Sequence, residues 1–223
     1  VYSKCAEDCR IDVFEEQHYV KFLEDENTIF FYDFDDLPVG ELPDGWEVVW
    51  DGESYGVSDD VYYSCCRSLR LKGAYSWSCV LQREFSSSAR YIGYEFKIYI
   101  DSRGTTHSEH PGFFCKDCET WGAYYARVQF RHSDGKIVAD DGTILGSWSP
   151  KTWYQVKVLL DREEKVYYVW IDDELIGDGL SVKRSDVHNI KALALVSGWA
   201  EANVYYDDVR VFEVIGGPSC KVW

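Results

Sequence analysis

The sequence predicts an all-β protein, an antiparallel sandwich of two sheets with an N-terminal extension. Apolar and polar residues alternate along 91–100, 124–131, 153–161 and 204–212, which is the period of a half-buried strand. Turn-forming pairs such as Asp51-Gly52 and Asp141-Gly142 separate the alternating runs. Many short strands at this spacing are typical of a sandwich, and 223 residues are enough to bury one sizeable core.

Three regions follow one another along the chain. Residues 1–27 differ from the rest, because two cysteines and a charged stretch precede an apolar run whose spacing fits a helix and a strand equally well. We therefore expect an N-terminal extension over 1–27, one sandwich domain over 28–214 and a C-terminal tail over 215–223. No internal repeat or low-complexity linker divides the central region.

The clearest strand is 91–100. Its even-numbered apolar residues should face the core, and Glu95, Lys97 and Tyr99 should face the opposite way. Alternating runs on both sides of a turn around 161–164 predict a hairpin. The last long β-rich run, 194–213, is interrupted only by an acidic pair.

Several segments resemble a known superfamily. They are TWYQVKVLLDREEKVYYVWIDDELIG at 152–177, ALVSGWAEANVYYDDVRVFE at 194–213, an opening FDD at 34–36 and SLRL at 68–71. Together they are similar to the strands of the concanavalin A-like lectin/glucanase superfamily, which includes laminin-G-like domains. The resemblance covers about 30–214 and implies a jelly-roll sandwich. That fold hosts lectins, glycosidases, adhesins and structural subunits, so it leaves the function open.

Charge narrows the range of partners. With 23 basic and 39 acidic residues, the net charge of −16 repels phosphate backbones and anionic lipid, so we expect neither nucleic acid nor membrane insertion. The same surplus favours a hard cation such as calcium. The resemblance implies that the first and last strands are adjacent and often hold calcium, which makes Asp33, Asp35, Asp36, Asp207 and Asp208 candidate ligands. The alternative is that these aspartates face water.

The number of cysteines indicates an oxidising compartment. A chain that starts at Val1, with no apolar signal stretch, is also expected to be a processed protein, secreted to the extracellular space or cell surface. We expect eight disulfide-bonded residues: Cys5, Cys9, Cys65, Cys66, Cys79, Cys115, Cys118 and Cys220. Neighbours in a strand point to opposite faces, so the adjacent pair at 65–66 should bond to two different partners.

One long irregular stretch, 101–123, allows a metal site. The spacing of His107, His110, Cys115 and Cys118 could wrap one tetrahedral zinc ion. The favoured alternative is a disulfide between Cys115 and Cys118, with the histidines facing solvent.

Aromatic residues are abundant, with nine tryptophans and seventeen tyrosines. Most should lie in the core. Four tryptophans near turns or glycines are candidate platforms on which a sugar ring could stack: Trp77, Trp121, Trp148 and Trp199. Anchors in a protein interface are the alternative for these residues.

Catalytic motifs are missing from the sequence. It contains no E-x-D-x-x-E strand of the laminarinase type, no G-x-S-x-G and no H-E-x-x-H, so we expect the protein not to be an enzyme, with a glycoside hydrolase the less favoured option. The main hypothesis is an extracellular structural protein that assembles with copies of itself into a filament, tube or layer. The alternative is a carbohydrate-binding, lectin-like module or adhesin with a polysaccharide partner.

Self-assembly would use the extension as a strand added to the sheet edge of a neighbouring subunit. Its apolar residues need a partner, because a short acidic segment cannot fold by itself. They are Ile11, Val13, Phe14, Tyr19, Val20, Phe22 and Leu23.

Overall fold

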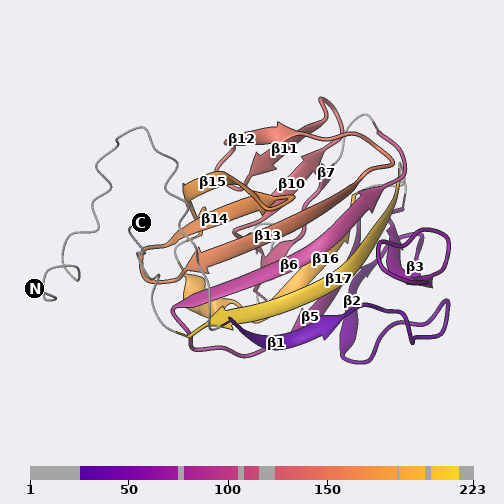
Figure 1. Ribbon diagram of the computed structural model, residues 1–223, viewed down its shortest axis with the longest axis horizontal. Helices are drawn as coiled ribbons and strands as arrows, with labels where there is room; N and C mark the ends of the chain where they lie inside the picture. Colours follow the sequence, from indigo (N-terminus) through magenta and orange to yellow (C-terminus); the bar gives the residue numbers. More distant parts are fainter. Residues whose placement is uncertain are drawn as a thin grey trace, which may run out of the picture.

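Antiparallel strands make up most of the computed structural model, which describes residues 26–74, 78–104, 108–115, 124–184, 186–198 and 202–215 (Figure 1). The strands are β1 Glu26–Tyr32, β2 Trp46–Asp51, β3 Ser54–Ser58, β4 Ser68–Lys72, β5 Cys79–Glu84, β6 Tyr91–Ile100, β7 Ser108–Glu109, β8 Gly112–Phe114, β9 Tyr124–Tyr125, β10 Val128–Arg131, β11 Lys136–Ala139, β12 Ile144–Ser147, β13 Trp153–Asp161, β14 Val166–Ile171, β15 Glu174–Ser181, β16 Ala192–Ser197 and β17 Asn203–Val214. The only helical turn among the described residues is the short 3-10 helix Val187–Asn189.

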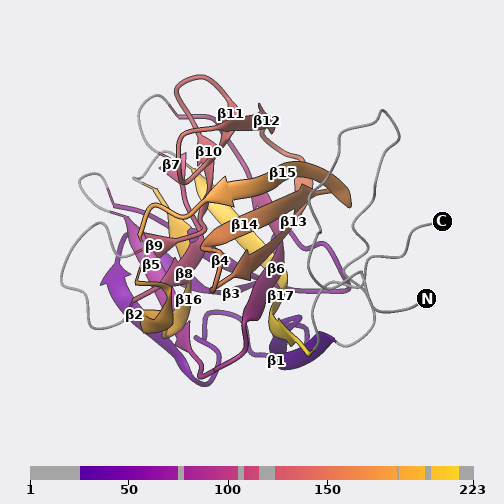
Figure 2. The ribbon, with the colours of Figure 1, turned by 90° about the vertical axis from the view of Figure 1, so that its left-hand side faces the viewer.

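The strands form one large sheet and two smaller ones. The main sheet has the order β15-β14-β13-β6-β17-β4-β3, and β1 also pairs with β17. The second layer consists of a five-stranded sheet, β2-β5-β16-β8-β9, and a four-stranded sheet, β12-β11-β10-β7. Figure 2 shows the main sheet on one side of the molecule and the smaller sheets on the other. The predicted all-β sandwich is confirmed, although its second layer is divided into two sheets.

The core lies between these layers. The even-numbered residues of β6, from Ile92 to Ile100, are at most 2% exposed, as the alternation predicted. Tyr94 of β6 packs edge-on against Phe113 of β8, with ring centroids 5.0 Å apart. Phe130 of β10 lies 5.9 Å from Tyr154 of β13. Both smaller sheets therefore pack on the same face of the main sheet.

The first and last strands are adjacent, as the resemblance implied. Strand β1 pairs with β17 along its length, with Tyr32 opposite Val209. The register of β17 against β6 shifts between Asp207 and Arg210, and Asp208 there has a φ of 48°. Strand β1 begins at Glu26, two residues before the expected start of the sandwich domain. The seven candidate assembly residues, between positions 11 and 23, lie outside the described residues.

The cysteines depart from the prediction. Cys65 and Cys66 are bonded to each other, because they lie in the loop between β3 and β4 rather than in a strand. Cys79 is buried and free, so the expectation that all eight are paired is wrong. Cys115 is disulfide-bonded, which removes a thiolate from the zinc alternative. Cys5, Cys9, Cys118 and Cys220, with His107, lie outside the described residues.

Candidate functional site

Trp148 is not an exposed platform. Its side chain is only 4% exposed, and its Nε1 donates a hydrogen bond to the carbonyl of Arg131 at 3.0 Å. Its ring packs against Phe130 and His132. The prediction of a sugar-binding role for this residue was wrong, because a position near a turn does not reveal where a side chain points. The other three candidates, Trp77, Trp121 and Trp199, lie outside the described residues.

Of the five candidate calcium ligands, Asp33 and Asp35 lie near enough to Asp208 for their charges to act on it, and Asp36 is exposed. Asp207 is fully buried, and its carboxylate accepts hydrogen bonds from the backbone N–H groups of Tyr63, Ser64 and Asp208. Burial raises the pKa of Asp208, and the charges of Asp33 and Asp35 raise it further. Over the described ranges, no group of three or more His, Cys, Asp or Glu residues could hold a metal ion. Calcium therefore stays a prediction.

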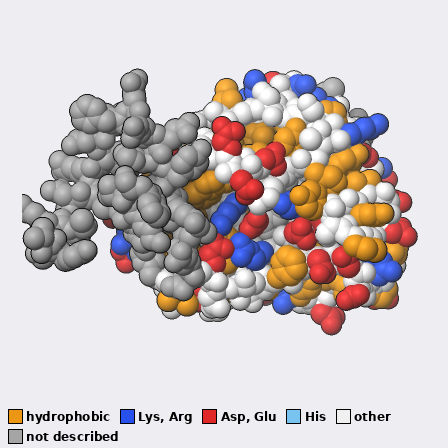
Figure 3. Space-filling view, in the orientation of Figure 1, with side chains coloured by type: hydrophobic (Ala, Val, Ile, Leu, Met, Phe, Trp, Pro, Cys, Tyr) orange, Lys and Arg blue, Asp and Glu red, His pale blue; other side chains and the backbone are white. Residues whose placement is uncertain are grey.

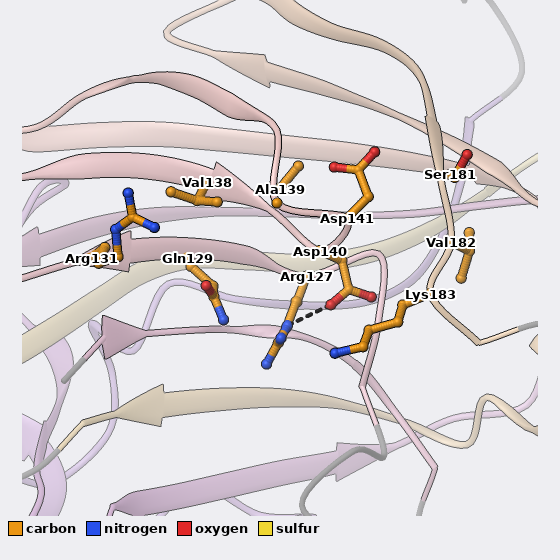
Figure 4. Close-up of a pocket in the computed structure, with 11 residues that line it drawn as sticks. Arg127, Gln129, Arg131, Val138, Ala139, Asp140, Asp141, Ser181, Val182 and Lys183 are labelled. Carbon is orange, nitrogen blue, oxygen red and sulfur yellow. Dashed lines mark hydrogen bonds and ion pairs between the residues drawn. The ribbon is translucent and has the colours of Figure 1, made fainter.

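A polar pocket lies on the four-stranded sheet of the second layer (Figure 4). In β10, Val128 and Phe130 face the core, so Gln129 and Arg131 face outward, and Arg127 precedes the strand. Strand β11 pairs with β10 and places Val138 opposite Gln129. The chain after β15 closes the other side. The pocket has a volume of about 390 Å³, and its polar lining includes Arg127, Gln129, Arg131, Asp140, Ser181 and Lys183.

Asp140 has one paired and one unpaired oxygen. Its side chain is 1% exposed, and its Oδ1 accepts a hydrogen bond from Nε of Arg127 at 2.6 Å. Its Oδ2 is buried and has no hydrogen-bond partner among the described residues. Burial raises the pKa of Asp140, while the charge and hydrogen bond of Arg127 and the charge and backbone N–H of Lys183 act in the opposite direction. A buried acceptor without a donor is costly, which is the usual reason to expect a ligand or water there.

Other residues that line the pocket carry hydrogen-bond donors. With its amide oxygen turned to Arg127, Gln129 accepts hydrogen bonds from Nη1 and Nη2 at 3.2 Å, which leaves its NH₂ group as a donor. Lys183 extends toward Asp140 and Arg127 in Figure 4 and carries an ammonium group with three N–H donors. Arg131 is held in place by Asp134, to which its Nε donates at 2.9 Å. The guanidinium groups and the amide oxygen of Gln129 are therefore held by hydrogen bonds, and the amide NH₂ and the ammonium group of Lys183 are the donors left for a ligand.

This arrangement suits hydroxyl groups. A hydroxyl can donate to Oδ2 of Asp140 and at the same time accept from Lys183 or Gln129, whereas an anion offers no proton to the carboxylate. Saccharides present several hydroxyls at neighbouring carbons, each able to do both. The pocket therefore has the donor and acceptor pattern of a site for a sugar.

This pocket was not predicted from the sequence. The strand 124–131 was visible as an alternating run, so the outward positions of Arg127, Gln129 and Arg131 could have been read from it. The burial of Asp140 could not be read from the sequence, because it results from the pairing of β10 with β11. Lys183 lies more than forty positions further along the chain, and only the fold brings it to the same place.

No protein-family model matches the chain, and neither does any curated protein. Solved structures do match. An O-glycanase structure, titled for gut-microbiota enzymes that initiate mucin breakdown, has a TM-score of 0.60 at 11% identity over 85% of this chain and 100% of that one. Domain 4 of AbnA, an extracellular arabinanase from Geobacillus stearothermophilus in complex with arabinotriose, has a TM-score of 0.59 at 12% identity over 87% and 96%. A sialidase has a TM-score of 0.53 at 12% identity over 76% of this chain. This chain spans only 17% of the length of that sialidase.

These similarities support the predicted jelly-roll sandwich fold. They also correct one expectation. The proteins named are mostly enzymes, namely a sialidase, an arabinanase, an alginate lyase and an O-glycanase, so the prediction that the chain is not an enzyme was wrong. The missing E-x-D-x-x-E strand excludes only one arrangement of catalytic carboxylates, and this fold carries others. At 11–12% identity, the likeness shows the fold alone.

Proposed function

We propose that this chain binds carbohydrate and that the pocket around Asp140 holds the sugar. The observation that carries the proposal is the buried, unpaired Oδ2 of Asp140 beside the donors of Gln129 and Lys183. The similar structures support it, because their names refer to polysaccharides or glycans and one of them is a domain in complex with arabinotriose. Carbohydrate binding is thus better supported than a filament subunit.

Two further expectations accompany the proposal. An extracellular protein fits the disulfide between Cys65 and Cys66, since such bonds persist in oxidising compartments. Self-assembly through the N-terminal extension stays a prediction. The part of the chain that the structure describes includes no helix long and apolar enough to cross a membrane.

Calorimetric titration tests the binding. The probes are arabinotriose, an alginate tetrasaccharide, 3′-sialyllactose and a mucin O-glycopeptide, which sample the sugar classes named for the similar structures. We expect at least one of them to bind, and Gln129→Ala and Lys183→Ala each to weaken that binding about fivefold to tenfold, since each removes one hydrogen bond worth about 1 kcal/mol.

Lys191→Ala is the matched control, because Lys191 is exposed and lies outside the pocket. The control should bind like the wild type. If none of the four probes binds, or if the two pocket variants bind as well as the control, the proposal fails.

A further inference from the structure

We propose a second saccharide site on the outer face of the main sheet, built on the aromatic ring of Tyr63. The inference rests on the proposed function, because it assumes that the ligand is a carbohydrate. It concerns the opposite layer of the sandwich from the Asp140 pocket. Figure 3 shows this outer face, where acidic and basic side chains lie among apolar ones.

Tyr63 is exposed and yet held flat. Its side chain is 52% exposed, and the Nζ of Lys97 lies 4.6 Å from the centre of its ring. Lys97 rises from β6 and is only 9% exposed, so the ring covers the ammonium group. One face of the ring is thus turned to the sheet, and the other face is turned to solvent.

Other contacts fix this orientation. The ring edge of Tyr63 meets Trp153, with centroids 5.8 Å apart and an interplanar angle of 72°. Beneath the ring, Lys97 donates a hydrogen bond to Gln155, whose amide donates to Glu95 at 2.7 Å. The platform is therefore supported by both an aromatic wall and a continuous polar network.

The backbone of the loop is also fixed. The N–H groups of Tyr63 and Ser64 donate to Oδ2 of Asp207 at 2.8 and 3.2 Å. The disulfide between the adjacent residues Cys65 and Cys66 follows immediately and restrains the backbone there. The backbone of Tyr63 is held by Asp207, and its ring is held by Lys97 and Trp153. Such a ring loses little conformational entropy when a ligand covers it, which favours binding by a single exposed aromatic residue.

The size and charge of the surface indicate a saccharide. Trp153 and Tyr99 are partly exposed and continue the aromatic row from Tyr63, with 5.4 Å between their ring centroids. A stable protein interface needs about 800 Å² on each partner, far more than three part-covered rings provide. Nucleobases also stack on such rings, but the net charge of −16 repels their phosphates. Sugar rings present a face of polarised C–H groups that fits the negative face of an aromatic ring.

Stoichiometry provides the test. Titrated with the same four oligosaccharides, the wild type should bind two molecules of whichever of them it binds. Tyr63→Ala should lower the stoichiometry from two to one and leave the affinity of the remaining site unchanged. Tyr63→Phe keeps the ring and should behave like the wild type.

Tyr62→Ala is the matched control, because Tyr62 is 48% exposed and lies next to Tyr63 in the sequence. It should keep both sites. An unchanged stoichiometry in Tyr63→Ala, or equal losses in both tyrosine variants, overturns the second site alone. If the Asp140-pocket variants bind normally while Tyr63→Ala abolishes all binding, only the pocket is overturned. No binding of any probe to the wild type overturns both.

Discussion

Asp207 should make the protein more stable as the pH falls from neutral toward 4.5. The residue lies on β17, is fully buried and is held by three backbone N–H groups. Burial raises its pKa from 3.8 to about 6, and the neighbouring charge of Asp208 adds to that effect. The unfolded chain keeps the ordinary value. Between these two values, the folded protein therefore binds a proton that the unfolded chain does not.

The sign and the size follow from this difference. An acid whose folded pKa is raised destabilises the fold when ionised, so stability rises as the pH falls through the folded pKa and levels off below the unfolded one. A shift of about two units corresponds to about 3 kcal/mol, of which about 2 kcal/mol is gained between about pH 7.5 and pH 4.5. Asp207→Asn lacks an ionisable group and should lack this gain.

Urea unfolding of both proteins across that pH range measures the effect. The free energy of unfolding of the wild type, relative to Asp207→Asn, should rise by about 2 kcal/mol on acidification. Asp161→Asn is a control of opposite sign once the series is extended below about pH 4. Burial alone would raise the pKa of Asp161, but hydrogen bonds from Arg90 and two backbone amides outweigh it and lower that pKa. The stability that Asp161 contributes is lost as the pH falls below about 4. A difference between the wild type and Asp207→Asn that stays constant across this pH range would show that the pKa of Asp207 is not raised on folding.

Three further predictions concern the thiols, the core and the metal. Burial raises the pKa of the free thiol of Cys79 to about 12. Iodoacetamide should therefore leave Cys79 unmodified in the folded protein and alkylate it after unfolding without reductant, as measured by peptide mass spectrometry. Labelling of Cys79 in the folded protein would contradict this. Gly93→Ala would place a Cβ 2.3 Å from Phe212 and 2.6 Å from the carbonyl of Val158, and should cost about 1–3 kcal/mol in urea unfolding, whereas Gly146→Ala, with open space around it, should cost far less. Calcium is tested by elemental analysis and by melting with and without EGTA, because a structural ion that binds only the folded state raises the melting temperature, and an unchanged value with no bound metal removes that prediction.

The fold could be predicted because alternation is a local signal. The runs that form β6, β13 and β17 each show it, and every core-facing residue expected in β6 is buried. The pairing of the first and last strands came from the resemblance rather than from the residues themselves. The division of the second layer into two sheets leaves no trace in the periodicity, because it depends on how short strands meet in space.

The site could not be predicted in the same way. Cys65 and Cys66 were assigned to a strand, but the loop turns there, and Cys66 has a φ of 88°, so the two side chains meet instead of diverging. Trp148 was expected at the surface, but its indole N–H reaches a carbonyl of β10. Asp140 and Lys183 are unremarkable in sequence, and their combination arises only when β15 leads the chain back to β11.

The most direct test of the proposed carbohydrate site is to map the bound sugar by NMR. The ¹⁵N-labelled protein would be titrated with arabinotriose, the alginate tetrasaccharide, 3′-sialyllactose and the mucin glycopeptide. With the sugar that binds, the largest amide and side-chain shifts should occur at Gln129, Asp140 and Lys183. Shifts that spare all three residues while the sugar binds elsewhere would contradict this expectation, and so would the absence of shifts with all four probes.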